Sequence, residues 1–344
     1  MLPPKPHHNA PIFVRLSAEK VDKYMRQFFF NSIHLIHSIW LFTYSDLKTI
    51  IANSVGFGLF TSLGIGAFGV MPEPSLALIY QRLPLVLLWA WINLLPFTIN
   101  NQRQPEAIME DLINKPWRTM PSKRMNQGQA KLLMFFFYIL AVCISSRIGG
   151  LDQCIALIGL GYWYNNAGGS DTSYIVRNLI NSVGFLCFTS GALRVMLSSL
   201  EWQTFIDSHN GGLQWLGIIG GIIFTTVQLQ DFYDQEGDSA RGRKTLPLVI
   251  GNKVARYLTA ALMVTWGFFT PIYWGGYNEG PGIGCLRGFG LYLALLASLI
   301  SWRTIAFWSV KADKLSFLLW NIWLVSQYAL PFFATLEFGR GGRA

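Results

Sequence analysis

Residues 213–230 read LQWLGIIGGIIFTTVQLQ, and residues 231–247 continue as DFYDQEGDSARGRKTLP. The first stretch has the apolar character and nearly the length of a helix that crosses a bilayer, for which about 20 residues are needed. The second stretch holds acids followed by cations, namely Asp231, Asp234, Glu236, Asp238, Arg241, Arg243 and Lys244. This region therefore predicts a membrane-spanning helix that leads into a charged site.

A second charged cluster lies nearer the N-terminus. It follows the apolar stretch 82–100 and consists of Glu106, Glu110 and Asp111, with Lys115 and Arg118 soon after them. Only 13% of the chain is charged, so two dense clusters of both signs require an explanation. Carboxylates beside lysine and arginine suit Mg²⁺-bridged binding of a diphosphate, in which the cations neutralise the remaining phosphate oxygens.

The composition is that of a membrane protein. Of the 344 residues, 52% are hydrophobic and 15% are aromatic, more than in a typical water-soluble domain. We expect an all-α polytopic bundle with nine spans, near residues 47–70, 82–100, 129–147, 150–167, 177–199, 213–230, 254–274, 285–306 and 316–336.

Outside the spans, the segment 28–44 is expected to form an amphipathic helix on or beside the bundle, in preference to a tenth crossing. The predicted organisation is an N-terminal segment at 1–45, one transmembrane domain at 46–337 and a short tail at 338–344.

The net charge of +9 reflects membrane topology. Most cations fall in alternate loops, on the side that also holds both acidic clusters, and the intervening loops have few. The positive-inside rule places this side in the cytosol. No nucleic-acid partner is expected, because the cations lie between apolar stretches and not along one soluble face.

In the second cluster, spacings of three and four residues predict that Asp231, Asp234 and Asp238 lie on one helical face. Three carboxylates so close together repel one another, and a divalent cation such as Mg²⁺ removes the repulsion. A solvated acidic loop is the alternative interpretation of this segment.

The first cluster offers further candidates. Asp111, Glu110, Glu106 and the amide of Asn101 are candidate metal ligands. Candidate diphosphate partners are the cations that follow the two acidic clusters, namely Lys115, Arg118, Arg243 and Lys244. Arg177 and Tyr164, which lie near the ends of neighbouring spans, are candidates for the same role. An aromatic belt at the membrane interface explains Tyr164 equally well.

Three strings carry a family resemblance: EDLINKPWRTMPS at 110–122, QDFYDQEGD at 230–238 and RKTLP at 243–247. They resemble the paired motifs of the UbiA superfamily of intramembrane prenyltransferases, and most of all its fungal branch of membrane-bound terpene cyclases. The resemblance covers roughly residues 45–335. It implies a nine-helix bundle around a lateral cavity, in the endoplasmic reticulum membrane, with both motifs capping the cavity and holding Mg²⁺ and a prenyl diphosphate.

The first motif departs from the family pattern Asn-x-x-x-Asp-x-x-x-Asp. Asp111 occupies the last position, but Ala107 and Arg103 stand at the other two. Ligands in a shifted register are the alternative, namely Asn101, Glu106 and Glu110. The second motif matches throughout, except that Gln230 replaces a common lysine.

The resemblance implies ionisation of an allylic diphosphate, with Asp231, Asp234, Asp238 and Asp111 as the catalytic carboxylates. The irregular first motif and the fungal branch favour cyclisation of farnesyl diphosphate to a sesquiterpene. Transfer of the prenyl chain to an aromatic or other acceptor is the alternative. A transporter is disfavoured, because its key charges usually lie near the membrane centre and the predicted spans have almost no acids there.

Overall fold

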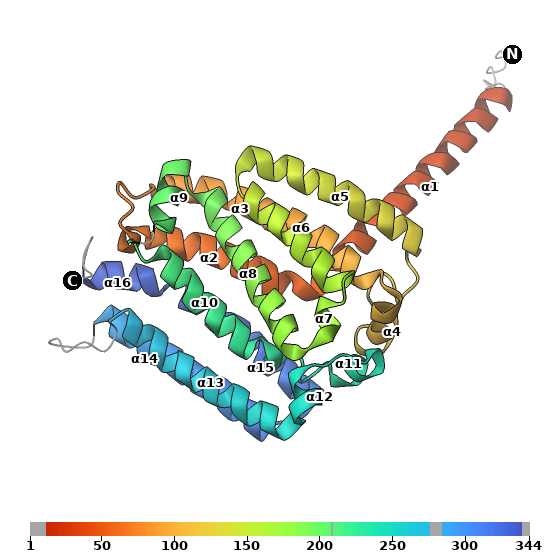
Figure 1. The fold of residues 1–344 in the computed structure, drawn as a ribbon. Coiled ribbons are helices and arrows are strands. Elements are labelled where there is room, and N and C mark those ends of the chain that lie inside the picture. The colour runs from red at the N-terminus through yellow and green to blue at the C-terminus, as the bar shows by residue number, and fades with distance from the viewer. Residues whose placement is uncertain (1–11, 208, 276–283, 339–344) are drawn as a thin grey trace, which may run out of the picture.

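The computed structural model describes residues 12–207, 209–275 and 284–338 (Figure 1). No strand occurs in these ranges, which confirms the all-α fold. The α-helices are α1 (Ile12–Thr43), α2 (Ala52–Leu63), α3 (Leu76–Gln102), α4 (Pro105–Asn114), α5 (Gln127–Ile148), α6 (Leu151–Asn165), α7 (Gly169–Thr172), α8 (Tyr174–Met196), α9 (Ser199–Ile206), α10 (Gly212–Thr226), α11 (Gln235–Arg241), α12 (Leu246–Ile250), α13 (Asn252–Tyr273), α14 (Cys285–Ala306), α15 (Val310–Gln327) and α16 (Leu330–Phe338). Short 3₁₀ turns are η1 (Tyr44–Asp46), η3 (Ile65–Phe68) and η4 (Val227–Gln230), and η2 (Leu47–Ile51) is a π-helix.

Within the described ranges, six helical segments are long and apolar enough to cross a membrane: Leu76–Gln102, Gln127–Ile148, Tyr174–Met196, Gly212–Gln230, Cys285–Ala306 and Val310–Glu337. They coincide with six of the nine predicted spans, and the chain is an integral membrane protein. The other three predicted spans are occupied by α2, α6 and α13. Helices α2 and α6 have only 12 and 15 residues, so the count of nine crossings stays a prediction.

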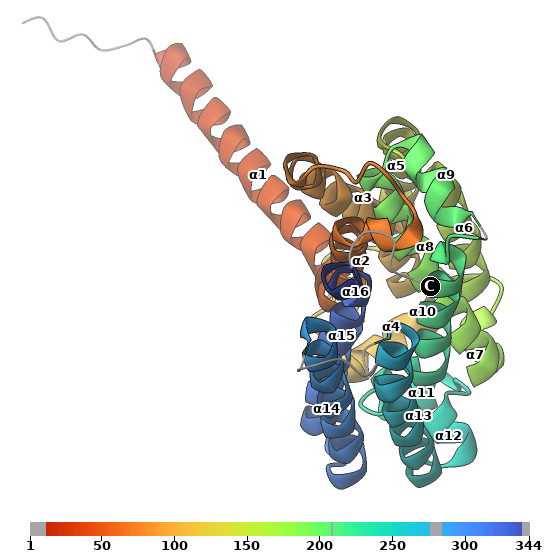
Figure 2. The same ribbon diagram turned by 90° about the vertical axis from the view of Figure 1, so that its left-hand side faces the viewer.

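The predicted helix at 28–44 is the second half of α1, which begins at Ile12 and projects from the bundle (Figures 1 and 2). Its last turns pack on α3, where Phe42 is fully buried in a cluster with Ile92 and Leu95. The helix then tightens into η1 and widens into η2 before α2 begins. Of the tail predicted at 338–344, only Phe338 lies within the described residues.

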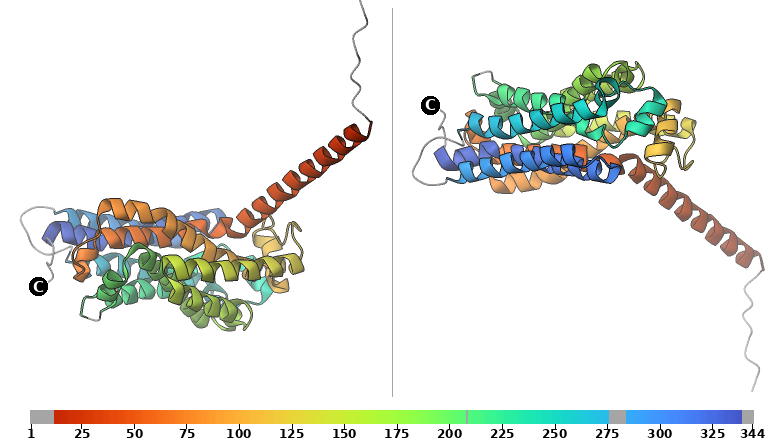
Figure 3. Two further views of the ribbon diagram at one scale, coloured as in Figure 1. Left: turned by 90° about the horizontal axis from the view of Figure 1, so that it is seen from above. Right: turned by 90° about the horizontal axis from the view of Figure 1, so that it is seen from below.

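The long helices run side by side along the molecule (Figure 3). The short helices α4, α7, α11 and α12 gather at the end from which α1 emerges, and α16 lies at the opposite end (Figure 1). Large buried side chains, including Trp89, Trp215, Trp320 and Trp323, fill the interior. The fold therefore presents both charged clusters at one end of an apolar bundle.

Candidate active site

Ion pairs between the two charged clusters hold α4 and α11 together. Lys115 Nζ, just after α4, lies 2.9 Å from Oδ2 of Asp234. In the opposite sense, Nη1 of Arg243 donates to Oε1 of Glu110 at 2.8 Å. Asn114 Nδ2 adds a hydrogen bond to the carbonyl oxygen of Asp234 at 3.1 Å. The two motifs are thus neighbours in space, although more than a hundred residues separate them in the chain.

The backbone through the second motif is not one continuous helix. Residues 231–234 form a turn between η4 and α11, and Asp234 is the N-terminal cap residue of α11. The prediction that Asp231, Asp234 and Asp238 share one helical face is therefore wrong. A straight helix would stack three like charges on one stripe, whereas this path lets each carboxylate meet a different cation.

Each of the two deeper carboxylates of the second motif has a guanidinium partner. Asp231 Oδ1 lies 2.8 Å from Nη1 of Arg177, and Asp238 Oδ1 accepts a hydrogen bond from Nη1 of Arg243 at 3.1 Å. Burial raises the pKa of the Asp231 carboxyl, and the nearby charge of Arg177 only partly opposes this effect. Both carboxylates are almost completely buried.

Arg118 connects the first motif to the start of the bundle. Its Nη1 donates to both carboxylate oxygens of Asp111, at 3.0 and 3.1 Å. Its Nε and Nη2 donate to Ser45 Oγ at 3.1 and 2.8 Å, and Nη2 lies 3.5 Å from Oδ2 of Asp46. Ser45 and Asp46, in η1, were not predicted as site residues. The only sequence signal for Asp46 is a carboxylate at the edge of an apolar stretch.

A second layer of ion pairs includes Arg241 and Asp171. Arg241 donates to Oε2 of Glu110 and to Oδ2 of Asp171, each at 3.1 Å. Nε of Arg243 donates to Oδ1 of Asp171 at 3.2 Å. Burial acts to raise the pKa of Asp171, but the charges of Arg241 and Arg243 outweigh it and the pKa is lowered. These contacts join α4, α7 and the segment around α11 into one unit.

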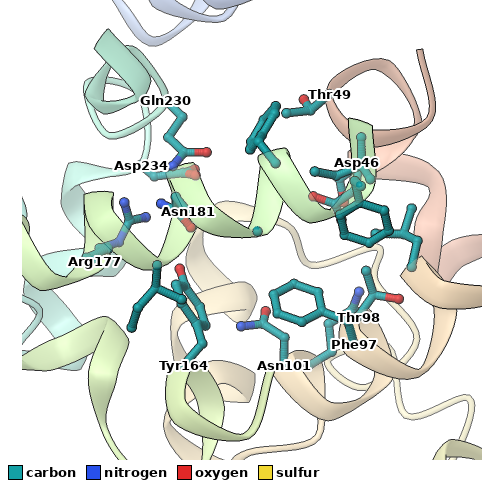
Figure 4. A pocket seen from close by; sticks show the side chains of 18 of the residues that line it. Asp46, Thr49, Phe97, Thr98, Asn101, Tyr164, Arg177, Asn181, Gln230 and Asp234 are labelled. Atoms are coloured by element: carbon teal, nitrogen blue, oxygen red, sulfur yellow. The ribbon is translucent and has the colours of Figure 1, made fainter. Parts of the chain in front are cut away.

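A cavity lies beside these charges. Its volume is about 1160 Å³, which includes the solvent-filled space at its opening. Charged side chains that line it are Asp46, Glu110, Lys115, Arg118, Arg177, Asp234 and Arg243. Farther from the motifs, helices α3, α6 and α8 line the cavity with apolar side chains, namely Phe97, Leu157, Ile180, Phe185 and Phe188. Phe317 also lines it, but next to the second motif, where its ring centroid lies 5.8 Å from that of Tyr233. Figure 4 shows Arg177 and Tyr164 near one another, with Asp234 above them. The cavity is therefore polar at the end that carries the motifs and apolar in its depth.

The structure brings most of the predicted site residues to this cavity. Those that line it are Asn101, Glu110, Lys115, Arg118, Tyr164, Arg177, Asp234 and Arg243. Asp111, Asp231 and Asp238 lie behind the lining, each paired with a lining arginine. Glu106 and Lys244 are exposed and do not line the cavity. Asn101 donates from Nδ2 to Oδ1 of Asn165 at 2.8 Å.

The donors present suit Mg²⁺, the cation that the resemblance implies. In proteins Mg²⁺ commonly takes one or two carboxylates and completes its shell with substrate phosphates and water. Both oxygens of Asp231 and one of Asp238 are buried and accept no hydrogen bond of regular geometry. Among the described residues, no three acidic, histidine or cysteine side chains form a preassembled metal site. In the first motif, both oxygens of Asp111 and both oxygens of Glu110 accept hydrogen bonds from arginines, so the second motif fits the ion better than the first.

Asn181 is a site residue that sequence reasoning missed. It lines the cavity one helical turn after Arg177 on α8, and Figure 4 shows the two side chains close together. Its Nδ2 is buried without a hydrogen-bond partner. The sequence signal was its i+4 spacing from Arg177, which places both on one helical face.

We predict that Gly237→Ala disturbs the contact between α4 and α11. A Cβ at this position would overlap the side-chain amide of Asn114, whose hydrogen bond to the Asp234 carbonyl would then be displaced. Overpacking of this kind costs about 1–3 kcal/mol, and we expect a lower melting temperature for the purified protein in detergent.

The matched control removes the Asn114 side-chain amide, which the new Cβ would overlap. In an Asn114→Ala background, Gly237→Ala should lower the melting temperature much less than in the wild type, because the two changes are coupled. An equal effect in both backgrounds would contradict this account of the α4–α11 contact.

Comparisons with known proteins agree with this architecture. The UbiA prenyltransferase family matches residues 102–324, which include both motifs. The chain is 29% identical to the fumagillin beta-trans-bergamotene synthase of Aspergillus fumigatus, over 89% of this chain and 95% of that protein. It is 26% identical to a polyprenyl transferase of Hericium erinaceus, over 67% and 74% of the two chains. A solved UbiA homologue from Archaeoglobus fulgidus, bound to DMAPP and Mg²⁺, shares the fold with a TM-score of 0.54 at 11% identity, over 83% of this chain and 98% of that one.

Proposed function

The chain belongs to the UbiA prenyltransferase family, and from this premise we propose that it ionises a prenyl diphosphate within the membrane with the help of Mg²⁺. The observation that carries the proposal is the division of one cavity into a charged mouth and an apolar depth. A prenyl diphosphate has the same division, with an anionic head on a hydrocarbon chain. The solved homologue bound to DMAPP and Mg²⁺ supports the pairing of these two ligands.

The proposed roles follow from the contacts. Mg²⁺, held by Asp231, Asp234 and Asp238, would neutralise charge on the departing diphosphate. Lys115, Arg118, Arg177 and Arg243 line the cavity and would donate charge-assisted hydrogen bonds to the phosphate oxygens, with Tyr164 and Asn181 as neutral donors. Asp111 holds Arg118 in position through its two hydrogen bonds. Glu106 and Lys244 have no role in this assignment, because both are exposed.

The apolar depth of the cavity suits an allylic carbocation. Such a cation is short-lived in water, and the bundle excludes water by packing side chains around the cavity. Phe97, Phe185 and Phe188 line it. An aromatic ring close to a cation stabilises it by about 0.5–2 kcal/mol.

For the fate of the cation, we favour cyclisation of farnesyl diphosphate to a sesquiterpene such as beta-trans-bergamotene. The support is the similarity to a bergamotene synthase over nearly the whole of both chains. Prenyl transfer to an aromatic or other acceptor is the second candidate, supported by the family itself and by the Hericium transferase.

One incubation separates the two candidates. Purified protein in vesicles with Mg²⁺ and farnesyl diphosphate, and with no acceptor, is expected to form a cyclic hydrocarbon and release diphosphate. The hydrocarbon is measured by gas chromatography with mass spectrometry and the diphosphate by an enzyme-coupled assay, and chelation of Mg²⁺ should stop the formation of both products. Turnover that begins only after an acceptor is added would replace the cyclase with the transferase.

We predict that Asp234→Asn lowers diphosphate release by about a hundredfold or more, because it removes a carboxylate that would hold Mg²⁺ against the departing diphosphate. Glu236→Gln is the matched control, since Glu236 belongs to the same motif but is exposed and should keep wild-type activity. Similar melting temperatures would show that both variants are folded. Retained release by Asp234→Asn would remove this carboxylate from the proposed mechanism.

We further propose that the cavity mouth faces the cytosol from the endoplasmic reticulum membrane, on the support of the cation-rich loops at that end. The test uses a chain in which the exposed Cys143 and Cys285 are replaced by serine. A membrane-impermeant maleimide added to intact microsomes should label Lys123→Cys, near the motifs. It should label Leu200→Cys, in α9, only after permeabilisation. The reverse pattern would invert the orientation.

A further inference from the structure

Helix α8 lines the cavity from its charged mouth into its apolar depth. The residues that do so are Arg177, Ile180, Asn181, Gly184, Phe185 and Phe188, and their spacing places them on one face of the helix. With a rise of about 1.5 Å per residue, Gly184 lies about 10 Å farther along the axis than Arg177. The face is cationic at Arg177 and aromatic at Phe185 and Phe188, and Gly184, its one residue without a side chain, lies between these two ends.

Packing does not explain the glycine at this position. A glycine within a helix is less favourable than alanine because of its greater backbone freedom, and several buried helical glycines here lie against a neighbour. A Cβ at Gly220 would come within 2.9 Å of Leu186, and one at Gly267 within 2.5 Å of Ala297. A Cβ at Gly184 would meet nothing within 4 Å. The space next to Gly184 is therefore not filled by protein atoms.

We propose that Gly184 determines which prenyl chains the cavity accepts, by leaving it wide where the hydrocarbon continues beyond the diphosphate. This inference rests on the proposed function and adds a specificity-determining residue to it. With the diphosphate at Arg177, the chain passes Gly184 before it reaches Phe185 and Phe188. Larger side chains at position 184 fill this space. They therefore exclude long or folded prenyl chains from the cavity before they exclude short ones.

The test compares Gly184→Ala, Gly184→Val and Gly184→Phe in the full-length protein. Diphosphate release is measured with Mg²⁺ and with geranyl, farnesyl or geranylgeranyl diphosphate. The compared quantity is the ratio of kcat/KM for geranylgeranyl diphosphate to kcat/KM for geranyl diphosphate. We expect this ratio to fall as the side chain at position 184 becomes larger, by about tenfold or more for Gly184→Phe. With the substrate that the wild type cyclises, the larger variants should shift the products toward acyclic ones.

Gly217→Phe is the matched control. Gly217 is also a helical glycine whose Cβ would meet nothing within 4 Å, but it is exposed on α10 and does not line the cavity. Gly217→Phe should keep the wild-type ratio of kcat/KM between the longest and shortest substrates. If folded Gly184→Phe also keeps this ratio, whether its activity is unchanged or is lost equally with all three substrates, the inference is overturned. A wild-type protein that releases diphosphate from none of them overturns the proposed function, and the inference with it.

Discussion

The two charged motifs are connected by two ion pairs of opposite sense, and the rest of the structure depends on this connection. Lys115 of the first motif pairs with Asp234 of the second, and Arg243 of the second pairs with Glu110 of the first. Glu110 and Arg243 are both buried, and removing one partner of a buried ion pair costs about 3–5 kcal/mol, because the other is left without compensation. Helices α4 and α11 therefore cannot separate without stranding buried charges, and the mouth of the cavity is held by the residues that face it.

The same pairing prepares the site for the ligands of the proposed function. The cations Lys115, Arg177 and Arg243 already lie at the cavity, but each is engaged by a carboxylate. Under the proposed function, a diphosphate would supply oxygens that replace those carboxylates, and a divalent cation would replace the guanidinium and ammonium groups beside the acids. Every buried charge would then keep a partner of opposite sign. Such a site would favour joint binding of metal and diphosphate over binding of either one alone.

Local sequence signals predicted the parts of the fold that depend on local properties. Apolar length located the six spans, and the density of charge located both motifs. The contribution of Ser45 and Asp46 was missed because it depends on contacts across the chain: Arg118 lies 73 residues from Ser45 in sequence. The turn at 231–234 was missed for the same reason. Periodicity reports which residues share a continuous helix face, but it does not report the distant cations that Asp231 and Asp234 contact from this turn.

The irregular first motif gains a physical meaning from these contacts. At the two positions where the family pattern has Asn and Asp, the chain has Arg103, which donates to Asn100, and Ala107, which is buried. The remaining acid, Asp111, is held by both oxygens against Arg118. The first motif therefore presents cations to the cavity, whereas the second keeps carboxylate oxygens without regular hydrogen bonds. Under the proposed function, the first motif would contribute cations for the diphosphate and the second would contribute the carboxylates for the metal, so a weakened acidic pattern in the first is compatible with the same chemistry.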